Sequence, residues 1–496
     1  MTNLILKDWS GGIRYNALNQ SEKKTSWAGA QNVELKSGHD GYGVCRMNGN
    51  ANLLKSALPA GTKILGLFEY KKGDSKYFVV NTSEGFFLEF DPSTGILSVP
   101  LKFGLSTTAR CSYVNFQNGV IVSNGVDDPF FYEHGADVPV KQCKAARYNV
   151  PIRGTALAEY NNRLFIGVGG TIFYSALGRY DDWTTADDAG YISDFHNTSA
   201  SILALKKYGE YLAIHKEGYT FLLTGTSPLD FSVCPFTDKG SSSSFCVVNA
   251  EGKQFFFNNG VYFLEYNSML QYKLSDEITP HVRPDFINID KTGIKDITAV
   301  HYAKKNQIWF FMNYLNLAGY SVCWIYDFIN NCWFKRVQQE IICACVYDDN
   351  IYTGTADGKI LLEDFGNSFD GEPIEFFFET PYFNLGLSSK QKSVEELNIL
   401  FDYSNINKFQ LEYRYNDDDR LVDTESVDQL DPETLIWDSE TQGLWSQKYF
   451  SVNTCTPVSF FPPGTFRSLQ LRFRGSDIDE DFGISGMEFL NVEMED

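Results

Sequence analysis

The sequence lacks the features that mark membrane spans and strong nucleic-acid binders. It has no run of about 18 apolar residues, which a membrane-spanning helix requires. Basic residues are comparatively few, because 42 Lys and Arg face 63 Asp and Glu, and the 496-residue chain carries a net charge of −21. Binding to nucleic acid or to anionic membranes depends on a basic excess. The charge balance therefore argues against both kinds of partner, and the missing apolar run argues against membrane insertion.

The basic residues that are present are dispersed. The pairs Lys206-Lys207 and Lys304-Lys305 are predicted at turns between strands, and no basic run is interleaved with aromatic residues. The first residues, 1–9, have neither the basic flank nor the long apolar core of a signal peptide. We therefore expect the protein to be made and assembled in the cytoplasm.

Motifs of catalysis and nucleotide binding are also missing. The chain has no nucleophile-elbow G-x-S-x-G, no phosphate-binding glycine loop and no H-E-x-x-H. The six histidines are far apart, and His215, between Ile214 and Lys216 on a predicted strand, is interpreted as structural. Carboxylates are plentiful, but nothing in the sequence singles out a catalytic pair. We therefore predict no catalytic and no cofactor-binding residues, no cofactor, and a protein that is not an enzyme.

Metal and disulfide patterns are weak. The ten cysteines include no C-x-x-C pair, and buried free thiols are favoured over disulfides. Cys343 and Cys345 would share one face of a strand, but no His lies nearby to complete a metal site. Residues 416–419 carry clustered oxygens without the spacing of a known calcium loop, so a solvated acidic loop is favoured. No metal-binding residue is predicted.

What the chain has in abundance is aromatic side chains, at 15 % of all residues, in a pattern that repeats. Helical periodicity is scarce, and short strands separated by turns dominate. Three strands recur, of which the third is rich in aromatic residues, in seven copies. The copies start at residues 67, 114, 157, 205, 248, 300 and 346. This spacing is typical of β-propellers, whose blades repeat every 40 to 50 residues or so and bury their faces against one another.

The fold class predicted is thus all-β. A β-propeller of roughly six to eight blades is expected over residues 61–371, with a fourth strand per blade in the segments between copies. Residues 1–60 read as an extended N-terminal arm with one or two strands. Residues 372–496 show period-two alternation and predict a C-terminal β-sandwich-like or jelly-roll-like domain, with a polar loop at about 416–446. The alternative is a set of unrelated meanders in a β-sandwich, which would have no steady period.

Several phrases, taken in order, resemble a known family. Residues 8–14 (DWSGGIR) and 30–35 (AQNVEL) are followed by 160–165 (YNNRLF), 173–178 (FYSALG) and Trp183. Further on, residues 202–205 (ILAL), 211–216 (YLAIHK) and 373–382 (PIEFFFETPY) continue the series. In this order they resemble tail nozzle proteins of short-tailed bacteriophages (podoviruses), also called tail tubular protein B or packaged-DNA stabilisation proteins. Residues 179–182 depart from the family, in which Asp-Pro is common there.

The resemblance covers residues 8–390 in patches, and it implies a structural virion protein. Such a protein forms the tail nozzle or tube, a ring that is usually a homohexamer, below the portal and the head-to-tail adaptor. The genome is retained and ejected through it, and tail fibres or spikes attach to it. Localisation in the virion tail and contact with passing double-stranded DNA without tight binding follow from the same resemblance. A cyclic ring needs two different contact faces on each subunit, for which the N-terminal arm and the C-terminal domain are the expected suppliers.

Two other functions stay open at this stage. One is a propeller enzyme that acts on host-surface glycans, which requires two or three carboxylates that converge at one mouth of a channel. The other is a cytoplasmic propeller adaptor that binds other proteins. Under the nozzle hypothesis, the charge of −21 predicts acidic side chains along the channel, where they keep DNA from adhering.

Overall fold

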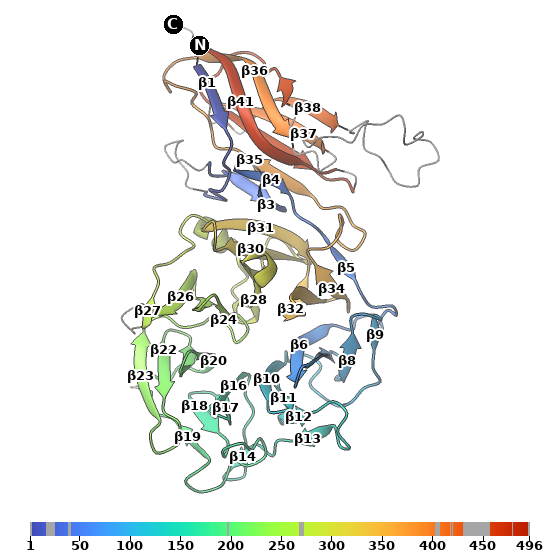
Figure 1. The fold of residues 1–496 in the computed structure, drawn as a ribbon, viewed down its shortest axis with the longest axis vertical. Helices are drawn as coiled ribbons and strands as arrows, with labels where there is room; N and C mark the ends of the chain where they lie inside the picture. Colours follow the sequence, from blue (N-terminus) through green and yellow to red (C-terminus); the bar gives the residue numbers. More distant parts are fainter. Residues whose placement is uncertain are drawn as a thin grey trace. The chain divides into compact units, whose positions relative to one another are not determined.

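The computed structural model describes residues 2–15, 25–37, 41–195, 198–266, 272–401, 407–416, 418, 420–429, 457–478 and 480–494. The chain is all-β, with many small antiparallel sheets (Figure 1). Contacts divide it into two compact units. Unit 1 comprises residues 1–49, 326–337 and 366–496, and unit 2 comprises residues 50–325 and 338–365. The sequence placed its boundaries after residues 60 and 371, whereas the contacts group the N-terminal 49 residues with the C-terminal region.

Within the described residues, seven four-stranded sheets follow one another along the chain in a propeller-like layout. The first four sheets are β6 (Ile64–Lys72), β7 (Ser75–Thr82), β8 (Phe87–Asp91) and β9 (Ile96–Leu97); β10 (Ser112–Phe116), β11 (Gly119–Ser123), β12 (Phe130–Tyr132) and β13 (Val140–Gln142); β16 (Ala156–Tyr160), β17 (Arg163–Val168), β18 (Thr171–Tyr174) and β19 (Gly190–Ile192); and β20 (Ile202–Tyr208), β21 (Tyr211–Lys216), β22 (Thr220–Thr224) and β23 (Ser232–Thr237).

The remaining three are β24 (Val248–Ala250), β25 (Lys253–Phe257), β26 (Val261–Tyr266) and β27 (Tyr272–Leu274); β28 (Thr298–Tyr302), β29 (Gln307–Asn313), β30 (Tyr320–Asp327) and β31 (Cys332–Gln339); and β32 (Ile341–Tyr347), β33 (Asn350–Thr355) and β34 (Ile360–Glu363) with β5 (Asn50–Asn52). Every one of the seven predicted copies falls on one of these sheets. The last sheet takes its fourth strand from the N-terminal part of the chain, since β5 pairs antiparallel with β34.

Tight turns join the strands of each sheet, and the sequence specifies several of them. Between β16 and β17, Asn161 and Asn162 adopt φ values of 49° and 58°. Two consecutive positive φ angles form the hairpin turn that suits the twist of two antiparallel strands, and Asn tolerates this conformation better than most residues. Two short 3₁₀ helices, η1 (Arg283–Asn288) and η2 (Ile294–Asp296), and a small hairpin, β14 (Ala146–Arg147) and β15 (Val150–Pro151), lie between sheets, and a third 3₁₀ helix, η3 (Ala303–Lys305), joins β28 to β29.

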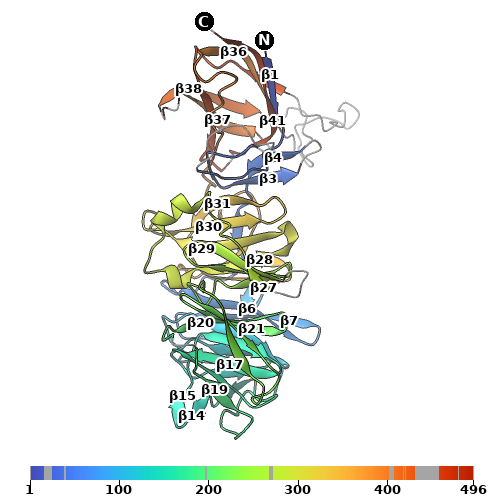
Figure 2. The same ribbon diagram turned by 90° about the vertical axis from the view of Figure 1, so that its left-hand side faces the viewer.

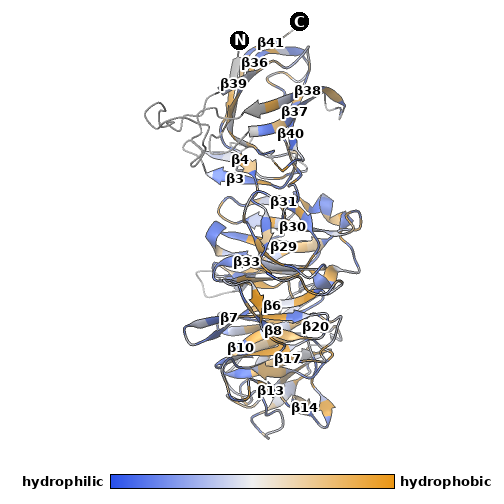
Figure 3. Cartoon of the chain, turned by 90° about the vertical axis from the view of Figure 1, so that its right-hand side faces the viewer, coloured by the Kyte–Doolittle hydropathy of each residue, from blue (hydrophilic) through white to orange (hydrophobic). Residues whose placement is uncertain are grey.

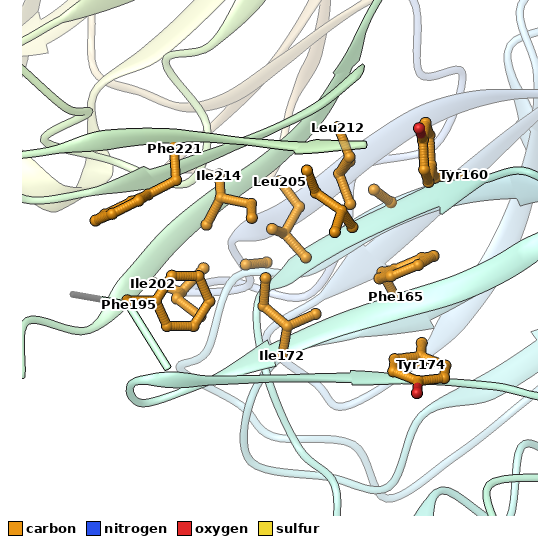
Figure 4. Packing of buried hydrophobic residues seen from close by; sticks show 13 residues of the cluster. Tyr160, Phe165, Ile172, Tyr174, Phe195, Ile202, Leu205, Leu212, Ile214 and Phe221 are labelled. Atoms are coloured by element: carbon orange, nitrogen blue, oxygen red, sulfur yellow. The ribbon is translucent and has the colours of Figure 1, made fainter. Parts of the chain in front are cut away.

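Neighbouring sheets are held together by large apolar side chains. Phe165 and Tyr174 of the third sheet form one buried cluster with Leu212, Ile214 and Phe221 of the fourth (Figure 4). Complete burial of such a side chain contributes about 1.5–3 kcal/mol, so one cluster of this kind supplies much of the attraction between two sheets. Hydrophobic residues run along β6 and β17, whereas the exposed tip of β7 is hydrophilic (Figure 3). The aromatic excess therefore serves the packing between sheets, as the sequence predicted.

Unit 1 contains two larger sheets. The first has the order β3-β4-β41-β36-β39 with β1 added beside β41 (Figure 2), and the second has the order β2-β35-β40-β37-β38. The strands are β1 (Thr2–Leu6), β2 (Gly29–Gln31), β3 (Val33–Ser37), β4 (Tyr42–Arg46), β35 (Phe376–Glu379), β36 (Lys392–Phe401), β37 (Asn407–Tyr415), β38 (Leu421–Gln429), β39 (Pro457–Phe460), β40 (Leu469–Gly475) and β41 (Gly483–Met494). Aromatic rings join the two sheets, as where Phe401 lies 5.6 Å from Phe409 between ring centroids.

The N-terminal region differs from its prediction. One or two strands were expected in residues 1–60, and the described residues hold five, from β1 to β5. Only β3 and β4 pair locally, with each other. The other pairings reach partners hundreds of residues away: β1 and β4 pair with β41, β2 with β35, and β5 with β34. Local alternation in a short strand is a weak signal when the partner is so distant. The polar loop predicted at 416–446 was wrong in part, because residues 421–429 form strand β38, which pairs with β37. Most of the rest of that segment lies outside the described residues.

Candidate functional site

The first strands of the sheets surround a cavity that is open to solvent on one side, which we call the central cavity. It has a volume of about 390 Å³ and is lined by β6, β10, β16, β20, β28 and β32 and by the segment that precedes β24. Each of the seven sheets thus contributes to its lining. Hydroxyl groups line part of it, and Thr155 Oγ1 lies 3.2 Å from Ser244 Oγ.

Arg110 is held in place at the wall of the central cavity by several contacts. Its guanidinium donates to the backbone oxygen of Asp296 (2.6 Å) and to Thr298 Oγ1 (2.8 Å), and it lies 3.8 Å from the centroid of the Phe245 ring. Burial lowers the pKa of the guanidinium, although arginine stays charged at any ordinary pH. Arg110 also lines the neighbouring cavity, so this side chain stands between the two spaces.

The neighbouring cavity, of about 500 Å³, carries acidic side chains. Glu84, Asp296 and Glu340 line it together with Lys63 and Arg110. The glycan-enzyme alternative requires two or three carboxylates that converge at one mouth, and these three residues line one cavity without forming a close cluster within the described residues. No distance between these carboxylates assigns an acid or a nucleophile, so that alternative stays a prediction.

Lys206 also lines the central cavity, and here the sequence prediction was wrong. The pair Lys206-Lys207 was expected at a turn, but both residues lie within β20. Successive side chains on a strand point to opposite faces. Lys206 accordingly lines the cavity, whereas Lys207 does not.

The thiols near the cavity are held in the protonated state. Cys343 and Cys345 lie on β32, as their spacing predicted, and both belong to a buried apolar cluster. Burial raises the pKa of the Cys343 thiol, and that of Cys111, to about 12. Thiols of this kind are poor nucleophiles and poor metal ligands. Across the part of the chain that the structure describes, nine cysteines are free, and no group of three or more His, Cys, Asp or Glu side chains is placed to hold a metal ion.

His215, for which the sequence predicts a structural role, is buried and hydrogen-bonded through both ring nitrogens. Its side chain has no exposed surface, Nε2 lies 2.9 Å from Gln254 Oε1, and Nδ1 lies 3.0 Å from Thr220 Oγ1. Burial lowers the pKa of the imidazole to about 4. The ring is therefore neutral at neutral pH and ties β21 to β22 and β25. His39, His196 and Cys455 lie outside the described residues.

The phrases behind the family resemblance form contact networks. In the N-terminal phrase, Trp9 is fully buried, and the backbone N–H of Ile13 donates to the oxygen of Trp333 (3.1 Å). Asn32 continues the network through its side-chain amide, which donates to the oxygens of Val337 (3.1 Å) and Glu375 (2.8 Å). The residues that make these phrases recognisable therefore hold separate segments of unit 1 together through hydrogen bonds and buried side chains.

The middle phrase forms a second network, within the third sheet. Arg163 pairs with Asp188 (2.6 Å) and donates to the backbone oxygen of Ser175 (3.1 Å), and Ser175 Oγ accepts from the Leu164 N–H (2.9 Å). The indole N–H of Trp183 donates to the Cys143 oxygen (3.1 Å). Arg163 and Ser175 thus join the first two of these phrases, whereas Trp183 ties its loop to the segment that contains Cys143.

Comparison with known proteins gives no family. No family model matches the chain, and no curated protein matches it. Among solved structures, the computationally designed Ika8 protein is 13 % identical, with a TM-score of 0.38, and covers 63 % of this chain and 99 % of its own. A chain of the mitotic checkpoint complex is also 13 % identical, with a TM-score of 0.43, and covers 71 % of this chain and 99 % of its own. Within the described residues, no helix is long and apolar enough to cross a membrane.

Proposed function

We propose that the seven four-stranded sheets form a closed, seven-bladed β-propeller and that the two sheets of unit 1 form a β-sandwich-like domain. Two observations support the closure. The first strand β6 lies beside β32, the first strand of the last sheet, and β5 completes that last sheet from the other end of the sequence. Because β5 comes from the N-terminal part of the chain and pairs with the last sheet, it joins the two ends of the proposed ring and covers an otherwise exposed strand edge.

We propose further that the protein is a structural component of the virion tail of a short-tailed bacteriophage, where it forms the nozzle that retains and ejects the genome. The observation that carries this proposal is the coincidence of the phrases with the contact networks. Asn32 and Arg163 occupy buried, multiply bonded positions, as residues that define a fold family should. The proposal assigns the chain no catalytic step.

A ring of identical subunits needs edges and faces on which one copy can contact the next. A closed propeller has few free edges, whereas the sheets of unit 1 end in open strands. The edge strand β38 carries Asp423 and Glu425 and exposes Leu421 and Val422 on its outer part. Carboxylates on an edge oppose pairing with an identical edge by charge repulsion. Such an edge favours a different surface of the neighbouring copy, which is the heterologous contact that ring closure requires.

The charge of the chain suits a conduit for DNA. At −21 per subunit, a ring of about six copies would repel the phosphate backbone along an acidic lumen, so DNA could slide without adhering. This placement implies two sets of partners. The portal and head-to-tail adaptor lie on one side of the ring, and tail fibres or spikes lie on the other.

The experiment is to measure the mass of the purified chain alone and after mixing with a portal–adaptor complex. Mass photometry should show a species that contains about six copies only in the mixture, and mass spectrometry should detect the chain in purified virions. A chain that stays monomeric in the mixture and is absent from virions would remove the proposal. Turnover of host-surface glycans that Glu84→Gln abolishes would instead support the enzyme alternative, and capture by a partner from uninfected cells would support the adaptor alternative.

A further inference from the structure

The central cavity holds two cations that lack a carboxylate partner, in a chain whose net charge is −21. Arg110 uses its two terminal nitrogens on a backbone oxygen and a threonine hydroxyl, both of which are uncharged. Its Nε is buried and has no hydrogen-bond partner. Among the residues that the structure describes, Arg110 forms no ion pair, and the nearby carboxylate of Asp296 acts on it only from a distance.

Lys206 is the second cation. The side chain lines the wall of the cavity and is exposed to solvent there, and partial desolvation lowers the pKa of its amino group. Within the described residues, Nζ contacts no hydrogen-bond acceptor and no carboxylate. An ammonium that has no protein partner and can be reached from solvent is available to an anion that enters the cavity.

The other charges of the cavity cancel one another. Glu69 lies 3.5 Å from Lys71 and 3.9 Å from Lys76, measured between carboxylate oxygens and ammonium nitrogens, and it accepts from the Asp348 N–H at 2.9 Å. Glu69 is thus already satisfied by other partners. The uncompensated charge that remains belongs to Arg110 and Lys206.

Donors and space are also present for a ligand. The hydroxyls of Ser112, Thr155 and Ser244 line the same cavity. A volume of about 390 Å³ exceeds the ~30 Å³ share of a single water molecule by an order of magnitude, so a small polyatomic anion fits. Tetrahedral oxyanions accept several hydrogen bonds at once and suit a mixed set of cations and hydroxyls.

We propose that the central cavity is a binding site for a phosphate group, held by Lys206 and Arg110. The proposal goes beyond the nozzle function and does not depend on it, because the site lies inside one copy of the chain. The phosphate could be a free ion or part of a nucleotide, and the two sources are separated by the test.

The test compares Lys206→Met with Lys207→Met. The two variants remove the same charge from neighbouring positions of β20, but only Lys206 lines the cavity. Inorganic phosphate, titrated by isothermal calorimetry at fixed ionic strength, should bind the natural chain and Lys207→Met alike, within about twofold. Lys206→Met should weaken binding about tenfold or more, because it removes a charge-assisted contact. Parallel titrations with ADP and with ribose show whether the phosphate is preferred free or attached to a nucleotide.

A second readout uses the amino group itself. Acetic anhydride at mildly alkaline pH should acetylate Lys206, and phosphate should slow this reaction severalfold while leaving acetylation of Lys207 unchanged, as measured by peptide mass spectrometry. Equal phosphate affinity of both variants, or no protection of Lys206, would overturn the proposal. Those results would leave the nozzle proposal untouched, and a failure to form rings would leave the phosphate site untouched.

Discussion

His215 makes the stability of the propeller-like unit sensitive to acid. In the folded chain its pKa is about 4, whereas an unfolded chain restores the ordinary value of 6.5. The unfolded state therefore takes up the proton at the higher pH, and acid favours unfolding. Stability from this group is complete above pH 6.5 and is lost as the pH falls toward 4. Each unit of pKa difference corresponds to ~1.4 kcal/mol, so the loss is about 2 kcal/mol at pH 5 and about 3 kcal/mol at pH 4.

The perturbation is His215→Gln, which removes the titrating ring and keeps a polar group near Gln254 and Thr220. Urea unfolding followed by tryptophan fluorescence gives the free energy of unfolding at pH 7 and pH 5. Between these values, the natural chain should lose about 2 kcal/mol more than the variant does.

The control is Thr220→Val, which removes hydrogen bonds to His215 and to the Lys239 oxygen but keeps the imidazole. It should lower stability by ~1 kcal/mol or more at pH 7 and retain the acid sensitivity. Equal losses between pH 7 and pH 5 in the natural chain and in His215→Gln would refute the reasoning that a buried neutral imidazole controls this behaviour.

Three further substitutions test other parts of the fold. Asn50→Asp places a second carboxylate beside Glu363, which is 3 % exposed. The variant should lose ~3 kcal/mol of stability, more than Asn50→Ala loses, and should regain part of it at pH 4. Equal effects of the two variants in thermal melts would contradict the proposal that β5 closes the last sheet. Gly12→Ala places a Cβ 2.6 Å from the Cys332 Cβ at a φ of +62°, whereas Gly73→Ala, at a φ of +57°, places its Cβ in open space. If the N-terminal phrase is under steric constraint, Gly12→Ala should lower the free energy of unfolding by at least about 2 kcal/mol more than Gly73→Ala does. Arg163→Met should lower the unfolding free energy by ~3 kcal/mol because it leaves buried acceptors without a donor, and an unchanged urea midpoint would show that the middle phrase is not a structural network.

Much of the sheet architecture could be predicted from the sequence, because three strands of each sheet are apolar and regularly spaced. Several of the fourth strands carry little signal. β9 has two residues and β13 has no buried side chain, so neither shows a hydrophobic period. β5 was not predicted for another reason. Its partner β34 lies some three hundred residues away, and no local pattern encodes such a pairing.

The candidate site was not predictable in the same way. Lys206 belongs to a pair of lysines that looks like a solvated turn, and Arg110 lies in a segment without a motif. Only the arrangement of the first strands around the cavity brings these two residues together. The spacing of Cys343 and Cys345, by contrast, was enough to place both on one face of a strand, because that geometry is local.

The most direct test of the central claim is a cryo-electron-microscopy reconstruction of the tail of a purified virion of the phage that encodes this chain. The account predicts a ring of about six copies below the portal and adaptor, in which acidic side chains face the DNA channel. A tail whose DNA channel is built without this chain would contradict the proposed function. A ring with a basic lumen would confine the role of the net charge to the outer surface.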